Sequence, residues 1–167
     1  CGGRSFEFFH SEHRQMPTMR EFHPWPLVKI SPQTAEEYGI NEGEWIWIEN
    51  TEGRCKQVAH IDPVIDPHYI HAEHGWWYPE QEPAFPHLYG AFDSNINNLT
   101  TSFETGFGGI GNPLKAPVCK IYKVTEENAA PLPGEVVTEK GGFRSDYVAG
   151  QPYAWTTDNT TREGGRF

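Results

Sequence analysis

The sequence predicts a mainly β fold with short helices, in which short strands close into a β-barrel with small helical insertions. Three observations support this prediction. Several short runs alternate between apolar and polar side chains, as strands with one buried face do. One segment carries both a helix start signal and a helix stop signal. The 167 residues include 17 glycines and 14 prolines, which favours many turns over long helices.

The N-terminal segment is predicted to be a strand followed by a polar loop. Residues 5–10 (SFEFFH) read as the first strand, and residues 11–22 as a loop that contains His13, Arg14 and Arg20. A polar loop that directly follows a strand is a natural place for ligand contacts, because loops carry function on a rigid scaffold. The alternative interpretation is an ordinary surface loop.

A strand and a short helix follow, and their boundaries are well marked. Residues 27–30 (LVKI) form the predicted strand. Ser31 suits the N-cap of the helix, and Pro32 suits its first position, where a missing N–H costs nothing. Gly39 stands where a left-handed residue would end the helix.

The remaining predicted strands complete one domain, which we expect to span residues 1–124. After it, residues 125–167 are rich in Gly, Thr, Glu and Asn, and we expect an extended or poorly structured tail without its own core. The predicted strands are residues 45–49 and 54–60, which pair through a turn at 50–53, and residues 69–72 and 116–124.

Charge and composition exclude some classes of function. The formal net charge of −10 argues against nonspecific binding to nucleic acid or to anionic membranes, which both need clustered positive charge. No window approaches the roughly 18 apolar residues of a membrane span, and no signal peptide is visible. A chain that begins at Cys1 rather than Met is expected to be a fragment or a processed product.

The cysteines are not expected to form disulfides or a thiolate zinc site. Cys1, Cys55 and Cys119 are far apart, and no C-x-x-C motif exists. Cys55 and Cys119 fall in predicted strands, so we expect both to be buried structural thiols.

Two further motifs are weak evidence for chemistry. Residues 106–111 match G-x-G-x-x-G, but a Pro and a strand follow instead of a helix, so the dinucleotide fingerprint is rejected. A loop that approaches a ligand and a plain connector both remain possible there. His68, His71 and His74 are spaced by three, and on a strand His71 would point away from the other two, so zinc is not expected.

Two stretches do carry candidate binding groups. Residues 74–80 (HGWWYPE) place several rings beside a glycine at a strand end, which would make either a hydrophobic plug or a platform against a flat heterocycle. Residues 94–100 (SNINNLT) offer amides that can pair with a base or pterin edge, or else form an Asn-rich turn. No self-contained active site is evident.

Taken together, these segments resemble a known family. The run from residue 27 to 60 is similar to the start of the molybdopterin-dinucleotide-binding domain of the dimethyl-sulfoxide-reductase superfamily. The runs HGWWxPE at 74–80, SNxNxLT at 94–100 and GNPxK at 111–115 then follow in that family's order. The first of these is most similar to the polysulfide/thiosulfate-reductase branch and to the branch that acts on hydroxylated aromatics.

The resemblance implies a fold, a cofactor and a set of contacts. The fold is a double-psi β-barrel, and the cofactor is bis-molybdopterin guanine dinucleotide carrying molybdenum or tungsten. Charged and amide side chains suit a cofactor with pyrophosphates and ring edges. The cofactor-binding residues that the resemblance implies are Ser11, His13, Arg14, His74, Gly75, Trp76, Asn95, Asn98 and Lys115.

The resemblance also implies that the chain is one part of an oxidoreductase of anaerobic respiration. The sequence lacks the cysteine motif for an iron–sulfur cluster and the segment that supplies a metal ligand in the complete enzymes. We therefore expect it to be non-catalytic alone and to work with the remaining domains of a catalytic subunit. Those parts are expected to hold the iron–sulfur cluster, and an iron–sulfur electron-transfer subunit is an expected partner.

Two other functions fit a barrel of this kind. One is a binding or assembly module without a cofactor, which would not need Arg14, the Trp pair and the Asn cluster together. The other is a small hydrolase or decarboxylase, which would need a self-processing Ser or a converging acid–base pair that the sequence does not offer.

Overall fold

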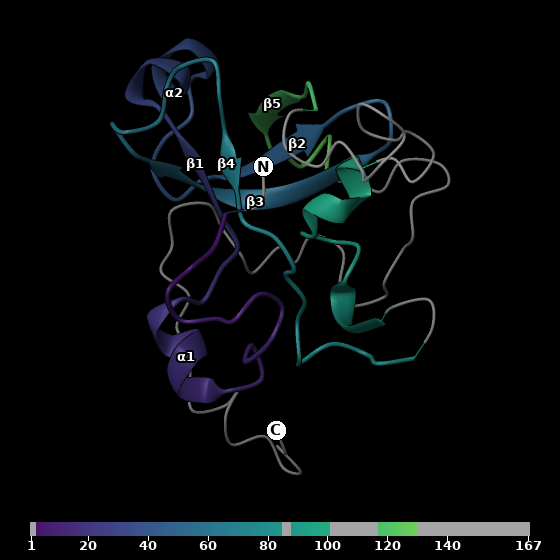
Figure 1. The fold of residues 1–167 in the computed structure, drawn as a ribbon. Coiled ribbons are helices and arrows are strands. Elements are labelled where there is room, and N and C mark those ends of the chain that lie inside the picture. Colours follow the sequence, from purple (N-terminus) through teal and green to yellow (C-terminus); the bar gives the residue numbers. More distant parts are fainter. Residues whose placement is uncertain (1–2, 85–87, 101–116, 130–167) are drawn as a thin grey trace, which may run out of the picture.

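The computed structural model describes residues 3–84, 88–100 and 117–129, which are organised around one mixed β-sheet (Figure 1). Within these residues the helical elements are α1 (Pro17–Phe22), α2 (Pro32–Tyr38) and the 3₁₀ turns η1 (Leu88–Gly90) and η2 (Ile96–Leu99). The strands are β1 (Leu27–Ile30), β2 (Trp45–Glu49), β3 (Arg54–Ile61), β4 (His71–Ala72) and β5 (Lys120–Lys123).

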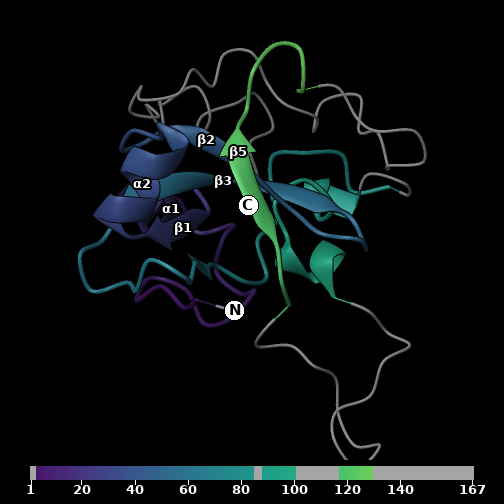
Figure 2. The ribbon, with the colours of Figure 1, turned by 90° about the horizontal axis from the view of Figure 1, so that it is seen from above.

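The five strands are arranged in the order β4-β1-β3-β2-β5. The central strand β3 pairs parallel with β1 and antiparallel with β2, and both outer pairings are antiparallel. Figure 2 shows β5 beside β2, with which it forms the last pairing. The prediction of a mainly β fold with short helices is confirmed, whereas closure into a double-psi barrel stays a prediction.

Helix α2 forms as its sequence signals indicate. The Oγ of Ser31 accepts a hydrogen bond from the backbone N–H of Thr34 at 3.0 Å, and Pro32 occupies the first turn. Gly39 ends the helix with φ +63°, and the next N–H, from Ile40, donates back to the carbonyl of Ala35 at 2.8 Å.

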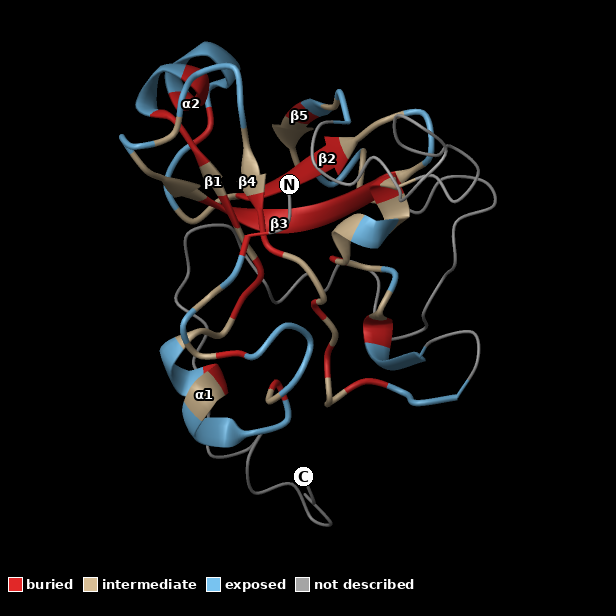
Figure 3. Ribbon diagram, viewed as in Figure 1, coloured by how far each residue is buried: buried red, intermediate tan, exposed pale blue. Residues whose placement is uncertain are grey.

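The core lies along β3 and its neighbours (Figure 3). The first six residues of β3 are all buried, which fits a central strand covered on both faces. Cys55 is fully buried in this core, while Cys119 is only half-buried before β5. The main cluster joins Val28, Ile30, Ala35, Ile40, Ile46, Ile48, Cys55, Ala59, Ala72, Leu99 and Ile121.

The prediction of a first strand at residues 5–10 is wrong. The N-terminal segment makes an isolated β-bridge between Gly3 and Glu73. Residues 5–10 form no strand and run as bends and turns. Of the aromatic residues in this run, Phe8 is buried while Phe6 and Phe9 are exposed. A run of aromatics mimics a strand in sequence, but here Phe8 packs in a small cluster with Trp76 and Tyr78 instead of joining the sheet.

Three other element boundaries differ from prediction. Residues 17–22 form α1 instead of loop, because Pro17 can open a helix even though Met16 provides no side-chain cap. The strand predicted at 69–72 shortens to His71–Ala72, because Tyr69 is taken up by a turn in which its N–H bonds to the Asp66 carbonyl. The last strand begins at Lys120 rather than at 116.

Contacts with the sheet continue just past residue 124. The side chain of Asn128 accepts a hydrogen bond from the indole of Trp47 at 3.0 Å and donates one to the carbonyl of Lys123 at 2.8 Å. The rest of the predicted tail, from residue 130, lies outside the described residues. In the described part of the chain, no helix has the length and apolar character to span a membrane.

Candidate functional site

A cavity of about 420 Å³ lies where the loop before α1, the segment after β4 and the region around η1 and η2 meet. Its walls combine aromatic faces with hydrogen-bonding groups, as sites for flat polar ligands do. The residues lining it are His10, Ser11, His74, Gly75, Trp76, Trp77, Leu88, Tyr89, Ala91, Asn95 and Asn97.

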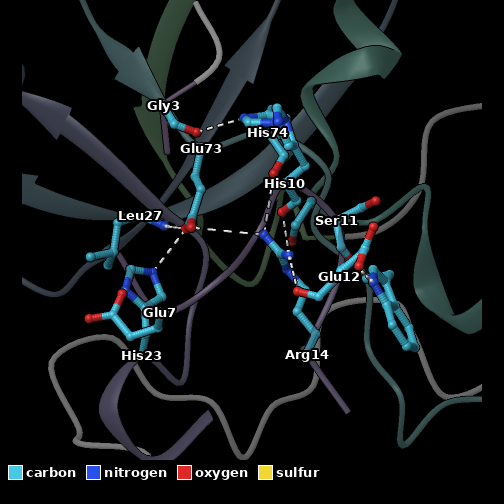
Figure 4. Close-up of polar contacts among 12 residues, drawn as sticks. Gly3, Glu7, His10, Ser11, Glu12, Arg14, His23, Leu27, Glu73 and His74 are labelled. Atoms are coloured by element: carbon cyan, nitrogen blue, oxygen red, sulfur yellow. Dashed lines mark hydrogen bonds and ion pairs between the residues drawn. The ribbon is translucent and has the colours of Figure 1, made fainter. Parts of the chain in front are cut away.

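Arg14 joins the loop before α1 to the segment after β4. Its side chain is 1% exposed, and its guanidinium donates to the carbonyls of His10 at 2.6 Å, Glu12 at 3.5 Å and His74 at 3.3 Å (Figure 4). Between these points His10 and His13 adopt left-handed backbone conformations, with φ of 56° and 74°. Non-glycine residues keep such conformations only where the surroundings impose them, and Arg14 provides that constraint.

The charge of Arg14 is stabilised by groups on several sides. Burial lowers the pKa of Arg14 to about 10, and the Glu73 carboxylate, 3.9 Å away, opposes that shift. The guanidinium also lies over the rings of Phe8, at 4.5 Å, and Trp76, at 4.8 Å. Arg14 therefore stays charged at neutral pH, behind the cavity rather than inside it.

Gln57, on the central strand β3, joins the segment after β4 to the segment before η2. This fully buried amide donates to the carbonyls of Glu73 at 2.7 Å and Ser94 at 2.9 Å, and it accepts from the Glu73 N–H at 3.0 Å. The hydroxyl of Tyr78 is bonded to the Ser94 hydroxyl at 2.7 Å. Sequence reasoning missed Gln57, although a glutamine amid a buried strand is a signal that such a group has partners.

Gly75 allows the segment after β4 to approach the loop that carries Ser11. Its φ is +68°, and a Cβ placed there would lie 3.1 Å from the Cβ of Ser11. The carbonyl of Ser11 also accepts a hydrogen bond from the indole N–H of Trp77 at 2.5 Å. Glycine is thus required both by backbone conformation and by close approach.

Two histidines form a bonded pair at the edge of the cavity. The Nδ1 of His74 lies 2.8 Å from the Gly3 carbonyl, which can only accept, so this nitrogen carries the proton. The Nε2 of neutral His74 is then an acceptor, and it faces the Nδ1 of His10 at 3.0 Å. These bonds assign both tautomers and leave the Nε2 of His10 as the acceptor of the neutral pair.

Trp76 is the plug beneath the cavity. It is fully buried, packs edge-on against Phe8 and Tyr78, and has the Arg20 guanidinium 5.1 Å from its ring. Its indole N–H is buried and has no acceptor among the residues that the structure describes. A bound ligand or water that brings an acceptor would satisfy this donor.

The two predicted amides have different roles. Asn95 lines the cavity and caps η2, since its Oδ1 accepts from the N–H of Asn97 at 3.1 Å. Asn98 does not line the cavity, and its amide donates to the carbonyls of Phe92 at 2.5 Å and Arg54 at 3.4 Å. Asn95 therefore lines the cavity, whereas Asn98 supports the backbone around η2.

The structure brings together five of the predicted site residues and separates the others. Arg14, His13 and Asn98 do not line the cavity, and Lys115 lies outside the described residues, as does the glycine-rich run at 106–111. His10, Trp77, Tyr89 and Asn97 are added to the lining. The five that line the cavity are Ser11, His74, Gly75, Trp76 and Asn95.

No cluster of three or more His, Cys, Asp or Glu side chains that could hold a metal ion occurs in residues 3–84, 88–100 and 117–129. Within the spaced histidines, His68 pairs with Asp66 at 3.1 Å, and His74 belongs to the histidine pair.

Asp93, a buried acid just before Ser94, gives a test by pH. Burial raises the pKa of Asp93 to about 6, against the opposing effects of Lys56 and Gln81. A raised pKa means that the folded state favours the protonated carboxyl group of Asp93. The protein therefore has its full stability below the unfolded pKa of about 4 and loses stability as pH rises through 6. Relative to wild type, Asp93→Asn should gain on the order of 2 kcal/mol in unfolding free energy between pH 4 and pH 7, measured by urea denaturation. If the difference in unfolding free energy between Asp93→Asn and wild type were the same at pH 4 and pH 7, the raised pKa of Asp93 would be contradicted.

The fold and the site together define a class: a small mixed-sheet domain with a cavity between loops that is lined by aromatic and hydrogen-bonding groups. Within that class, residues 1–112 match the family model described as the molydopterin dinucleotide binding domain. The chain belongs to this family.

Similar proteins support the same assignment. The chain is 43% identical over 129 residues to a dopamine dehydroxylase of Eggerthella lenta, which covers 77% of this chain and 12% of that protein. It is 38% identical over 82 residues to an acetylene hydratase of Syntrophotalea acetylenica, covering 49% of this chain and 11% of that protein. The solved acetylene hydratase from Pelobacter acetylenicus superposes with a TM-score of 0.63 at 30% identity, covering 74% of this chain and 18% of that one. The chain thus spans only about an eighth of the dehydroxylase.

Proposed function

We propose that this chain is the C-terminal domain of the catalytic subunit of a molybdenum or tungsten oxidoreductase and binds bis-molybdopterin guanine dinucleotide. The observation that carries the proposal is the cavity, in which His74, Gly75 and Asn95 come together from distant segments. We place the domain at residues 1–124, with the packed residues up to Asn128 extending its edge.

The groups around the cavity fit a pterin or purine ring. The ring of Trp77 lies 5.4 Å from that of Tyr89, so two aromatic faces border the space. The Asn95 amide and the Nε2 of His10 supply a donor and an acceptor for a ring edge. When bound, the cofactor supplies the metal redox chemistry, while these residues bind it, orient it and exclude water.

The activity of the whole protein follows from this role. We propose that the remaining domains supply the metal ligand and an iron–sulfur cluster, and that an iron–sulfur subunit delivers electrons. A protein named dopamine dehydroxylase matches over 129 residues, and this agrees with one of the two branches that the run at 74–80 resembles, the one that acts on hydroxylated aromatics. We therefore propose a hydroxylated aromatic compound as the substrate of the whole enzyme.

The direct test is to purify the complete polypeptide without oxygen and to measure its metal and guanine nucleotide content. Acid hydrolysis should release about two GMP for each molybdenum or tungsten, as the proposed bis-dinucleotide cofactor requires. A folded and assembled protein with neither metal nor GMP would overturn the proposal. It would favour the binding or assembly module instead.

The role of Asn95 can be separated from its role as a cap. Serine is also a good N-cap, so Asn95→Ser should keep η2 while removing the amide donor. We expect cofactor affinity to fall roughly tenfold, as for a lost hydrogen bond to a polar ligand, with little change in unfolding temperature. Asn98→Ser serves as the comparison, because Asn98 holds backbone carbonyls: there stability should fall more than affinity. Equal cofactor content in wild type and Asn95→Ser would remove Asn95 from the site.

A further inference from the structure

His23, just after α1, lies between two carboxylates behind the cavity (Figure 4). Its Nε2 is 2.9 Å from an oxygen of Glu73, and its Nδ1 is 3.3 Å from an oxygen of Glu7. The His23 side chain is only 12% exposed. The Glu73 contact is a hydrogen bond and the Glu7 contact is at ion-pair distance, so both carboxylates attract the ring together when both ring nitrogens carry protons.

The three residues belong to three separate segments. Glu7 precedes the loop that carries His10 and Ser11, while Glu73 directly precedes His74. A doubly protonated His23 therefore joins the two segments that form opposite walls of the cavity. A neutral ring can donate to only one of the two carboxylates, and it has no charge with which to attract the other.

Glu73 has further contacts besides the one with His23. That carboxylate also accepts from the Leu27 N–H at 3.1 Å and faces Arg14 at 3.9 Å. On the remaining side, the rings of Phe8 and Trp76 lie 5.5 and 5.9 Å from the imidazole.

Beyond the Trp76 ring is a second ion pair, between Arg20 and Glu80 at 3.4 Å. The cations near His23 are thus Arg14 and Arg20, while the carboxylates of Glu7 and Glu73 are in direct contact with its ring.

We propose that His23 is a positioning residue whose second proton fastens the two walls of the cavity, so that the site loosens as pH rises and this proton is lost. The sign follows from the contacts: the charged form has both partners, so its contribution is present at lower pH and disappears at higher pH. The proposal rests on the proposed function only where cofactor retention is the readout.

Hydrogen exchange of the complete polypeptide, followed by mass spectrometry, tests the proposal without cofactor. The reporter is the loop peptide that contains the Glu12 N–H, which donates to the Phe9 carbonyl at 2.9 Å. After correction for intrinsic exchange, this peptide should exchange roughly tenfold faster at about pH 9 than at about pH 6, which corresponds to losing one charge-assisted bond. A corrected rate that is the same at both pH values would overturn the proposal.

Glu7→Gln is the decisive variant. A glutamine amide can accept from a protonated ring nitrogen or donate to a bare one, so this variant should hold His23 in either state. Its loop peptide should therefore exchange slowly at both pH values. Glu42→Gln is the matched control, because Glu42 pairs with the exposed His60 at 2.8 Å away from the cavity, and it should keep the wild-type pH dependence. A Glu7→Gln protein with the wild-type pH dependence would also overturn the proposal.

Cofactor retention provides a second readout that separates the two proposals. GMP retained after dialysis should fall between about pH 6 and pH 9 in wild type and stay constant in Glu7→Gln. If exchange depends on pH as expected but no GMP is present at any pH, the proposed function fails and the role of His23 stands. If GMP is present and exchange is independent of pH, the role of His23 fails and the proposed function stands.

Discussion

Replacing Arg14 with methionine is expected to lower the free energy of unfolding by about 3–5 kcal/mol, the range for breaking a buried ion pair from one side. The change removes the guanidinium that faces Glu73 and that bonds the carbonyls of His10 and His74. It leaves the Glu73 carboxylate buried with one cation fewer, and it frees the strained His10 backbone. The loop should detach from the segment after β4, so cofactor content should fall together with stability.

Two comparison variants separate charge from geometry. Arg14→Lys keeps the charge but cannot bond several carbonyls with a planar fork, so it should recover only part of the loss. Arg4→Met removes an arginine from the same segment at an exposed position and should change stability by less than about 0.5 kcal/mol. Urea unfolding and GMP content measure both effects. If Arg14→Met behaved like Arg4→Met, Arg14 would have no anchoring role.

The sequence predicts those parts of the fold whose signals are local. Helix α2 is bounded by Ser31, Pro32 and Gly39, each of which acts within one turn, and all three act as expected. By contrast, α1 begins at Pro17 after Met16, which makes no side-chain cap, so Pro17 is a weak start signal that does not by itself distinguish this helix from a polar loop. Strand length was overestimated where pairing partners, rather than propensity, set the limits, as at β4 and β5.

The candidate site shows the same division. Its rings and amides stand out in the sequence because they occur in compact runs, and five of the predicted residues do line one cavity. Their support could not be predicted, because Arg14 and Glu73, or Gln57 and Ser94, meet only after the chain has folded. An arginine in a polar loop was therefore predicted to contact the cofactor, although its bonds are to the protein's own backbone. A direct phosphate contact by Arg14 stays a prediction.

Trp76→Ala is expected to cost about 3–5 kcal/mol of unfolding free energy, as large-to-small changes of buried aromatic residues do. Trp76 fills the space between Phe8 and Tyr78, and the guanidiniums of Arg14 and Arg20 lie 4.8 and 5.1 Å from its ring. Alanine would leave a cavity and deprive both cations of the ring. Thermal or urea unfolding measures the loss, and Trp76→Phe should recover much of it by refilling the space.

The neighbouring Trp77 distinguishes a plug from a platform. It is only half-buried, its ring contacts Tyr89, and its N–H holds the Ser11 carbonyl at the cavity wall. Trp77→Ala should therefore lower cofactor retention roughly tenfold while costing much less stability than Trp76→Ala. The two interpretations of the run at 74–80 then both apply, one to each tryptophan, because Trp76 is fully buried and Trp77 is only half-buried. If both variants lost stability equally and Trp77→Ala retained its cofactor, the whole run would be a plug, and the ligand would have to bind elsewhere.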